Sequence, residues 1–172
     1  MSKTTSPQVG IVMGSDSDWP KIKAVAVALD EFGVRHEVRV MSAHRTPEIV
    51  QQYATTAAAR GLKVLIAAAG GAAHLAGVVA SHTTLPVIGL PVPTDLAGGL
   101  DSLLSIVQMP GDVPVATVGL GAGGPRNAGL LAVQILALSD PPLQEKLVAF
   151  KKTLADKVMV KDAALQESLR GT

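Results

Sequence analysis

The feature that most constrains the fold is a regular alternation between short apolar runs and segments of helical length. The apolar runs are rich in Val and Ile, and each is bounded by Gly, Pro or Ser: Val9–Met13, Glu37–Val40, Val64–Ala68, Val87–Leu90 and Val115–Val118. Short runs of this composition are typical of parallel strands that are covered on both faces. The sequence therefore predicts five fully buried strands.

The intervening segments carry the start and stop signals of helices. They are Trp19–Phe32 before Gly33, Pro47–Arg60 before Gly61, a short segment after Gly71, Leu100–Gln108 and Pro125–Leu138. Thr46, Pro47 and Glu48 form a good helix start, because Thr can cap, Pro fits the first turn and Glu complements the helix dipole. After a break at Ser139–Pro142, a last amphipathic helix carries the apolar stripe Leu143, Leu147, Phe150, Leu154 and Val158.

This strict β-α alternation predicts an α/β fold, a three-layer α/β/α sandwich with a central parallel sheet and right-handed crossovers. With 172 residues, the chain has about the length of one domain. We expect a single domain over residues 1–172, with its core at about 9–138 and a C-terminal helical extension at about 141–165. Ligands of such folds bind beyond the carboxyl ends of the strands, so a site is expected in the loops that follow them.

The composition excludes several classes of protein. The chain has no cysteine, hence no disulfide, no thiolate nucleophile and no Cys-bound zinc or iron–sulfur cluster. Its four histidines lack HxH or HExxH spacing, and a net charge of +1 with 2% aromatic residues does not suit nucleic-acid binding. Residues 1–8 do not resemble a signal peptide, and Val64–Ala80 is too short and too interrupted to span a bilayer. We expect a cytoplasmic protein without a metal, a nucleic-acid partner or a membrane partner.

The first loop suited to chemistry follows the first predicted strand. The hydroxyls of Ser15 and Ser17 and the backbone amides from Gly14 to Asp18 could hold a phosphate. In the alternative interpretation, Ser17 or Asp18 only caps the helix that follows.

The second loop, Ser42–Thr46, places an imidazole, a guanidinium and two hydroxyls at the same edge of the sheet. The planar fork of Arg45 suits a phosphate. An imidazole can give and take protons near neutral pH, so His44 is the best acid–base candidate. The alternative is a loop histidine that only hydrogen-bonds to the backbone.

The third loop, Ala69–Leu75, has small residues where a flat ligand could approach the main chain. Its glycines could instead only allow a strand and a helix to pack closely. His74 has two interpretations, because it could hold a carboxylate or a ring carbonyl, or it could only satisfy a neighbouring loop. His36 and His82 fall at the opposite edge of the sheet and are predicted to be structural.

A fourth motif, Gly119–Gly124, matches the GxGxxG pattern of dinucleotide-binding folds. A dinucleotide-binding fold has this motif after its first strand and an acidic residue about 20 residues later, at the end of the next strand. Here the motif follows the fifth strand, and the acidic residue Asp140 follows a helix with no strand between that helix and Asp140. Neither a GxxxxGK[ST] phosphate loop nor a Met-Lys-Met biotin site occurs. Carboxyl chemistry in this chain would therefore proceed without ATP or biotin.

Four motifs in this order resemble one family closely: Val12–Trp19, Ser42–Pro47, Ala69–Leu75 and Leu100–Pro110. The family is that of the bacterial N5-carboxyaminoimidazole ribonucleotide (N5-CAIR) mutases of the PurE type, and the similarity extends from about Val9 to Leu138. The resemblance implies a flavodoxin-like domain, a homo-octamer whose active sites are completed by neighbouring subunits, and a C-terminal helix that extends to those neighbours. Ala76 and Val78 depart from the Pro and Met that the family usually has, which concerns the stiffness of this loop.

The resemblance also implies roles for individual residues, with His44 as the catalytic residue. The residues that would bind substrate are Ser15, Ser17, Ser42 and Arg45 at the phosphate, Asp18 at the ribose, Gly70, Gly71, Ala72, Ala73, His74 and Leu75 along the base and carboxylate, together with Ala43.

The implied reaction moves the carboxyl group of N5-CAIR from the exocyclic nitrogen to ring carbon C4 in de novo purine biosynthesis. The product is 4-carboxy-5-aminoimidazole ribonucleotide (CAIR), His44 acts as general acid and base, and no cofactor takes part. One alternative is an enzyme that carboxylates aminoimidazole ribonucleotide (AIR) directly with CO2, although the Ser15–Trp19 loop favours the mutase. Another is a non-catalytic nucleotide- or flavin-binding module of the same fold.

Overall fold

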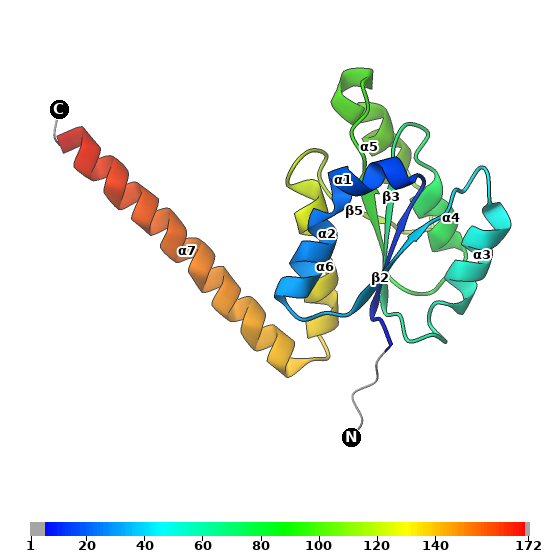
Figure 1. Ribbon diagram of the computed structural model, residues 1–172, viewed down its shortest axis with the longest axis horizontal. Helices are drawn as coiled ribbons and strands as arrows, with labels where there is room; N and C mark the ends of the chain where they lie inside the picture. The colour runs from blue at the N-terminus through cyan, green and yellow to red at the C-terminus, as the bar shows by residue number, and fades with distance from the viewer. Residues whose placement is uncertain (1–5, 171–172) are drawn as a thin grey trace. The chain divides into compact units, whose positions relative to one another are not determined.

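The computed structural model describes residues 6–170, and within them the strands form one parallel, five-stranded sheet (Figure 1). The strands are β1 (Val9–Met13), β2 (His36–Val40), β3 (Val64–Ala69), β4 (Val87–Pro91) and β5 (Ala116–Thr117). Their order across the sheet is β2-β1-β3-β4-β5, which is the flavodoxin-like order. The predicted α/β class with a central parallel sheet is confirmed.

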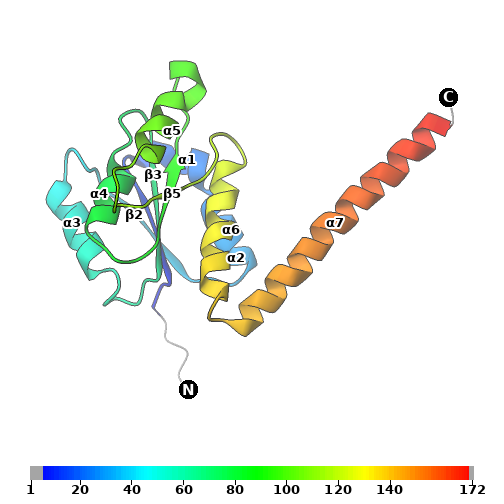
Figure 2. The ribbon, with the colours of Figure 1, turned by 180° about the vertical axis from the view of Figure 1, so that it is seen from behind.

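Helices cover both faces of this sheet (Figure 2). The helices of the described residues are η1 (Asp16–Asp18), α1 (Trp19–Ile22), α2 (Ala24–Glu31), α3 (Pro47–Thr56), α4 (Leu75–Ser81), η2 (Leu96–Gly99), α5 (Leu100–Val107), α6 (Gly124–Ala137) and, in a separate compact unit, α7 (Pro141–Arg170). On one face α2 and α6 pack closely, since a Cβ at Gly129 would lie 2.8 Å from the Cβ of Ala28. On the other face α3, α4 and α5 enclose a core cluster that includes Val50, Leu75 and Ile106.

The prediction that all five strands are fully buried is wrong for the two at the edges. Every residue of β1, β3 and β4 is buried. In contrast, β2 exposes three of its five residues, and β5 has only two residues, one exposed and one half-buried. An edge strand has a neighbour on one side only, and an apolar run does not reveal which strands will be at the edge.

Local signals placed the helices well but not all of their ends. The first predicted helix, Trp19–Phe32, is divided at Lys23 into α1 and α2, and α3 ends at Thr56, before the predicted Arg60. Thr46 is the N-cap residue of α3, yet its hydroxyl makes no capping hydrogen bond to that helix. It donates to the Ser42 carbonyl at 3.1 Å and accepts from the Ser42 amide at 2.9 Å. Thr46 therefore closes the loop that precedes the helix.

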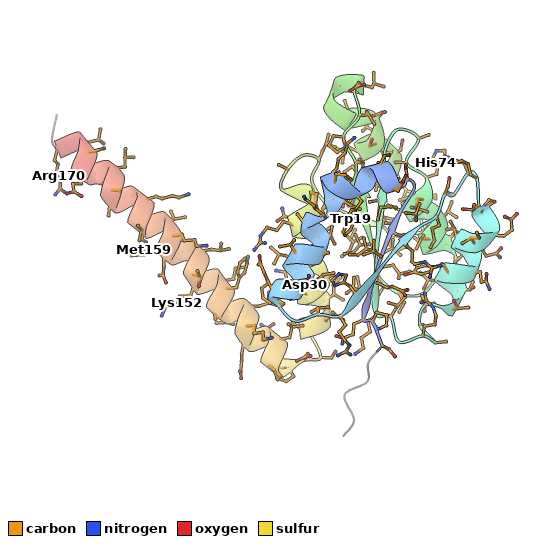
Figure 3. All side chains as sticks on the ribbon, viewed as in Figure 1. Trp19, Asp30, His74, Lys152, Met159 and Arg170 are labelled. Carbon is orange, nitrogen blue, oxygen red and sulfur yellow. The ribbon has the colours of Figure 1, made fainter. Side chains whose placement is uncertain are left out.

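Contacts group the chain into two compact units, one ending at Ile135 and the other beginning at Leu136. Most of the second unit is α7, in which Leu143 and Leu147 of the predicted stripe are buried while Leu154 and Val158 are exposed. Met159, labelled in Figure 3, is also exposed. A single domain over residues 1–172 stays a prediction. None of the helices in residues 6–170 has both the length and the apolar character needed to cross a membrane.

Candidate functional site

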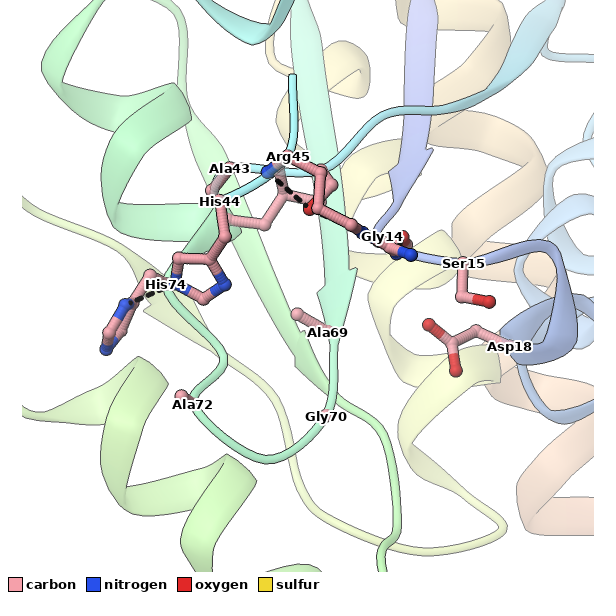
Figure 4. Close-up of a pocket in the computed structure, with 12 residues that line it drawn as sticks. Gly14, Ser15, Asp18, Ala43, His44, Arg45, Ala69, Gly70, Ala72 and His74 are labelled. Carbon is pink, nitrogen blue, oxygen red and sulfur yellow. Dashed lines mark hydrogen bonds between the residues drawn. The ribbon is translucent and has the colours of Figure 1, made fainter. Parts of the chain in front are cut away.

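A cavity of about 360 Å³ opens where three loops leave the carboxyl ends of β1, β2 and β3 (Figure 4). It is lined by Gly14, Ser15, Asp18, Ser42, Ala43, His44, Arg45, Ala69, Gly70, Ala72, His74 and Leu75. The chain places β2 on one side of β1 and then β3 on the other side, so the loops after β1 and β3 diverge at this point. Such a switch point is where open parallel sheets form their ligand crevice.

His44 and His74 meet at the edge of this cavity, although they come from different loops. Nε2 of His44 lies 2.7 Å from Nδ1 of His74, and the ring planes are nearly perpendicular, at 81°. A neutral imidazole has one donor and one acceptor nitrogen, so one nitrogen of this pair donates and the other accepts. The hydrogen bond therefore orients both rings. The observed partner of His44 is an imidazole, not the backbone.

Arg45 joins the loops that follow β1 and β2. Its Nη2 donates to the Gly14 carbonyl at 3.0 Å, and its Nε donates to Oγ of Ser42 at 3.4 Å. In the part of the chain that the structure describes, no carboxylate lies within ion-pair distance of Arg45. The guanidinium charge is held in place without being neutralised, which is an arrangement that favours an anionic ligand.

The loop after β1 is organised by Ser15. Oγ of Ser15 accepts the amide proton of Ser17 at 3.3 Å and lies 2.8 Å from the Ser17 hydroxyl oxygen. Ser15 is therefore the cap of η1, and Asp18 is the N-cap residue of α1 but makes no side-chain capping hydrogen bond to that helix. Asp18 lies at the cavity, where burial raises the pKa of its carboxyl and the nearby charge of Lys21 opposes that rise.

Three of the residues expected at the site do not line the cavity. Ser17 is turned toward Ser15, Gly71 bonds to α5 through its backbone, and Ala73 is buried at 1% exposure. Gly14 and Ala69 also line the cavity, although the family resemblance gave neither of them a substrate-binding role. Both adjoin a strand end and lie in loops to which the edge rule had pointed.

The remaining histidines lie away from the cavity, as the same rule predicted. His36 is the first residue of β2, with Nδ1 3.3 Å from the Val34 carbonyl, and His82 follows the end of α4. Within residues 6–170, no group of three or more His, Cys, Asp or Glu side chains could hold a metal ion.

Fold and site together define a flavodoxin-like α/β protein whose crevice, at the switch point of its sheet, presents two imidazoles and a guanidinium. The sequence model of the AIR carboxylase family matches residues 8–157, and the chain belongs to this family.

Individual relatives are similar over nearly the whole chain. The N5-carboxyaminoimidazole ribonucleotide mutase of Mycobacterium tuberculosis is 61% identical over 160 residues, which cover 93% of this chain and 91% of the relative. The mutase of Mycobacterium leprae is also 61% identical, over 95% of this chain and 94% of its own. A crystal structure of Treponema denticola PurE has a TM-score of 0.84 at 32% identity, covering 92% of this chain and 98% of that one.

Proposed function

We propose that this chain is an N5-CAIR mutase, an isomerase of purine biosynthesis that converts N5-CAIR to CAIR. The observation that carries the proposal is the hydrogen-bonded pair of His44 and His74 beside the unpaired charge of Arg45 in the switch-point cavity. The identity of 61% to the mutase of M. tuberculosis supports the same reaction.

The phosphate of the substrate binds at the wall formed by Ser15, Ser42 and Arg45. Hydroxyl groups and a guanidinium are the donors that phosphate oxygens accept best. Ser17 does not line the cavity, and its hydroxyl oxygen lies 2.8 Å from that of Ser15. Ser17 therefore reaches the phosphate only if this hydrogen bond opens. Asp18, which lies beside Ser15 in the cavity (Figure 4), then accepts hydrogen bonds from the ribose hydroxyls.

The base and carboxylate lie along Gly70–Leu75 and Ala43. Gly70, Ala72 and His74 face the ligand. Gly71 and Ala73 do not line the cavity, so they only shape the backbone of this loop.

His44 transfers the proton that the rearrangement requires. The bond from the exocyclic nitrogen to the carboxyl carbon breaks, and a bond from C4 to the same carbon forms. The nitrogen gains a proton as its carboxylate leaves, and C4 loses one after the carboxylate has attached. Protonated His44 supplies the first proton and the neutral ring accepts the second, which restores the starting state. His74 keeps the ring of His44 in position for both steps.

If the carboxyl group moves as CO2, the cavity must hold the gas against C4 and keep water out, because its escape would leave AIR. The apolar part of the lining consists of Ala43, Ala69, Ala72 and Leu75. The acceleration then comes from proximity, with no need for a cofactor.

The test is to give the pure protein either N5-CAIR or AIR with bicarbonate and to follow CAIR by its absorbance. We expect CAIR from N5-CAIR without ATP. Efficient formation of CAIR from AIR and bicarbonate, with N5-CAIR left unused, would establish the direct carboxylase instead. Absence of CAIR in both reactions together with tight flavin binding would establish the non-catalytic module.

We also propose that the protein is a cytoplasmic homo-octamer in which α7 extends to neighbouring subunits. Exposed apolar side chains support this assembly: Leu96, Leu100, Leu104 and Val107 on η2 and α5, and Val148, Val158, Met159, Val160 and Leu165 on α7. Apolar surface of this extent is typical of subunit interfaces. Light scattering should give the mass of eight chains, and the mass of one chain would contradict the assembly.

A further inference from the structure

Ser102, on the inner side of α5, is the one polar residue that is fully buried in the part of the chain that the structure describes. Its Oγ donates to the Val92 carbonyl at 2.8 Å and accepts the amide proton of Gly71 at 2.9 Å. Val92 follows β4 and Gly71 follows β3, so one hydroxyl joins two loops at the carboxyl edge of the sheet. A buried hydroxyl with both of its roles filled is expensive to lose, because removal leaves two backbone groups without a partner.

Ser105, one helical turn further along α5, holds the other side of Gly71. Its Oγ donates to the Gly71 carbonyl at 3.2 Å. The amide and the carbonyl of Gly71 are thus both bound by serines of the same helix. Gly71 has a φ of +68°, a left-handed conformation that glycine adopts without strain. The two serines therefore fix a specific turn of the backbone.

This turn determines where His74 lies. His74 is three residues after Gly71 and is the N-cap residue of α4, so the segment between them has little freedom. The Val92 amide also donates to the Ala69 carbonyl at 2.9 Å, which fixes the start of the same loop. Neither Ser102 nor Ser105 lines the cavity. Ser105 therefore acts on the histidine pair through Gly71, and Ser102 acts through Gly71 and through Val92, which holds Ala69 at the start of the loop.

We propose that Ser102 and Ser105 are positioning residues, which hold the Gly70–Leu75 loop so that His74 meets His44. The kinetic part of this inference rests on the proposed mutase function. The structural part, the alignment of two imidazoles by a helix outside the cavity, does not depend on it. A purely stabilising role for the serines is the competing explanation.

The kinetic test compares Ser105→Ala with Ser105→Thr, which keeps the hydroxyl. Ser105 is only half-buried, so both variants should fold. We expect kcat of Ser105→Ala to fall about 10- to 100-fold, since small misplacements of catalytic groups cost this much. KM should change less, because the phosphate wall belongs to other loops, and Ser105→Thr should recover most of kcat. Ser81→Ala is the matched control, since its hydroxyl bonds only to Val78 within α4.

A second readout does not depend on activity, namely the nitrogen NMR signals of the four imidazoles, assigned with single His→Gln variants. In Ser105→Ala and Ser102→Ala, the signals of His44 and His74 should shift while those of His36 and His82 stay. Unshifted signals would overturn the proposal, even if kcat fell, because the loss would then reflect stability alone. If Ser102→Ala does not fold, the two Ser105 variants decide. If the wild type lacks mutase activity, the proposed function fails, but the histidine signals still decide whether the serines position the pair.

Discussion

The two ends of the parallel sheet carry the same kinds of polar side chain and use them in opposite ways. At the amino end, Oε1 of Glu37 accepts from the Tyr53 hydroxyl at 2.8 Å and from Nη1 of Arg60 at 2.7 Å. The Arg60 guanidinium also lies 4.6 Å from the centre of the Tyr53 ring. At the carboxyl end, Arg45 has no carboxylate partner within residues 6–170, and His44 is exposed at the cavity. The amino end satisfies its charges internally, whereas the carboxyl end keeps them available.

The pKa shifts of Glu37, Tyr53 and Asp18 follow the same division. Burial disfavours the ionised form of Glu37, but hydrogen bonds from Arg60 and Tyr53 outweigh it, so the pKa of Glu37 lies below its ordinary value. Burial and the neighbouring Glu37 raise the pKa of Tyr53. At the cavity, burial raises the pKa of Asp18. The fold thus stabilises the carboxylate of Glu37 at the amino end and tolerates a less stable one, that of Asp18, in the cavity, as expected where a residue serves a ligand.

The largest effect is expected from His44→Asn. Loss of the acid–base group should lower kcat by about 10² to 10⁴-fold. The thermal transition and the affinity for CAIR should stay nearly unchanged, because the side chain is exposed and the phosphate wall is intact. His36→Asn, at the amino end, is the control that should keep kcat. Near-normal isomerisation by His44→Asn would contradict the assignment.

Arg45→Leu should act on binding more than on turnover. The loss of charge-assisted hydrogen bonds to a phosphate corresponds to about 1.5–3 kcal/mol, or roughly 10- to 100-fold in affinity. Arg45→Lys, which keeps the charge and loses the planar fork, should give an intermediate affinity. Calorimetry with CAIR measures both variants, and an unchanged affinity of Arg45→Leu would refute the phosphate role.

The contrast between the two ends was partly predictable from the sequence. The apolar runs and the rule for strand ends brought Ser15, His44 and His74 to one edge, because strand direction in a β-α repeat leaves little choice. The exposure of β5 was not predictable, since it depends on which strands become neighbours, whereas Glu37 and Arg39 in β2 are a signal of an exposed strand. The break at Lys23 was equally hidden, because Trp19–Phe32 carries no Gly in its interior and its only Pro lies at the second position.

Long-range contacts account for the rest of what the sequence did not reveal. Ser102 lies in the motif Leu100–Pro110, but its partner Gly71 is 31 residues away in the chain. Likewise, Thr46 resembles a helix cap by its position, and only the fold shows that Ser42 competes for its hydroxyl. Local propensity predicts which groups can bond, and the tertiary structure decides which do.

A smaller effect, on stability, is expected from Tyr53→Phe at the amino end. The variant removes the hydroxyl that donates to Glu37 and leaves the ion pair with Arg60, so the free energy of unfolding should fall by about 1 kcal/mol. Urea unfolding measures this change. The kcat should equal that of the wild type, and a clear loss of kcat would show that the two ends are not functionally separate.

The smallest effect is expected from Glu37→Gln, and it depends on pH. Because the pKa of Glu37 is lowered in the folded protein, its contribution to stability is present above its ordinary pKa and is lost as the pH falls through the lowered value. Glutamine does not titrate, so the stability of the variant should fall less steeply than that of the wild type below about pH 5. The side chain is partly exposed and solvent screens the effect, which should be small.

Unfolding curves of Glu37→Gln and the wild type across this pH range measure the difference. If the two curves ran parallel, Glu37 would ionise equally in the folded and unfolded chains. The amino-end cluster would then hold no charge-dependent stability, and the two ends of the sheet would differ in the accessibility of their polar groups but not in how the fold treats a charge.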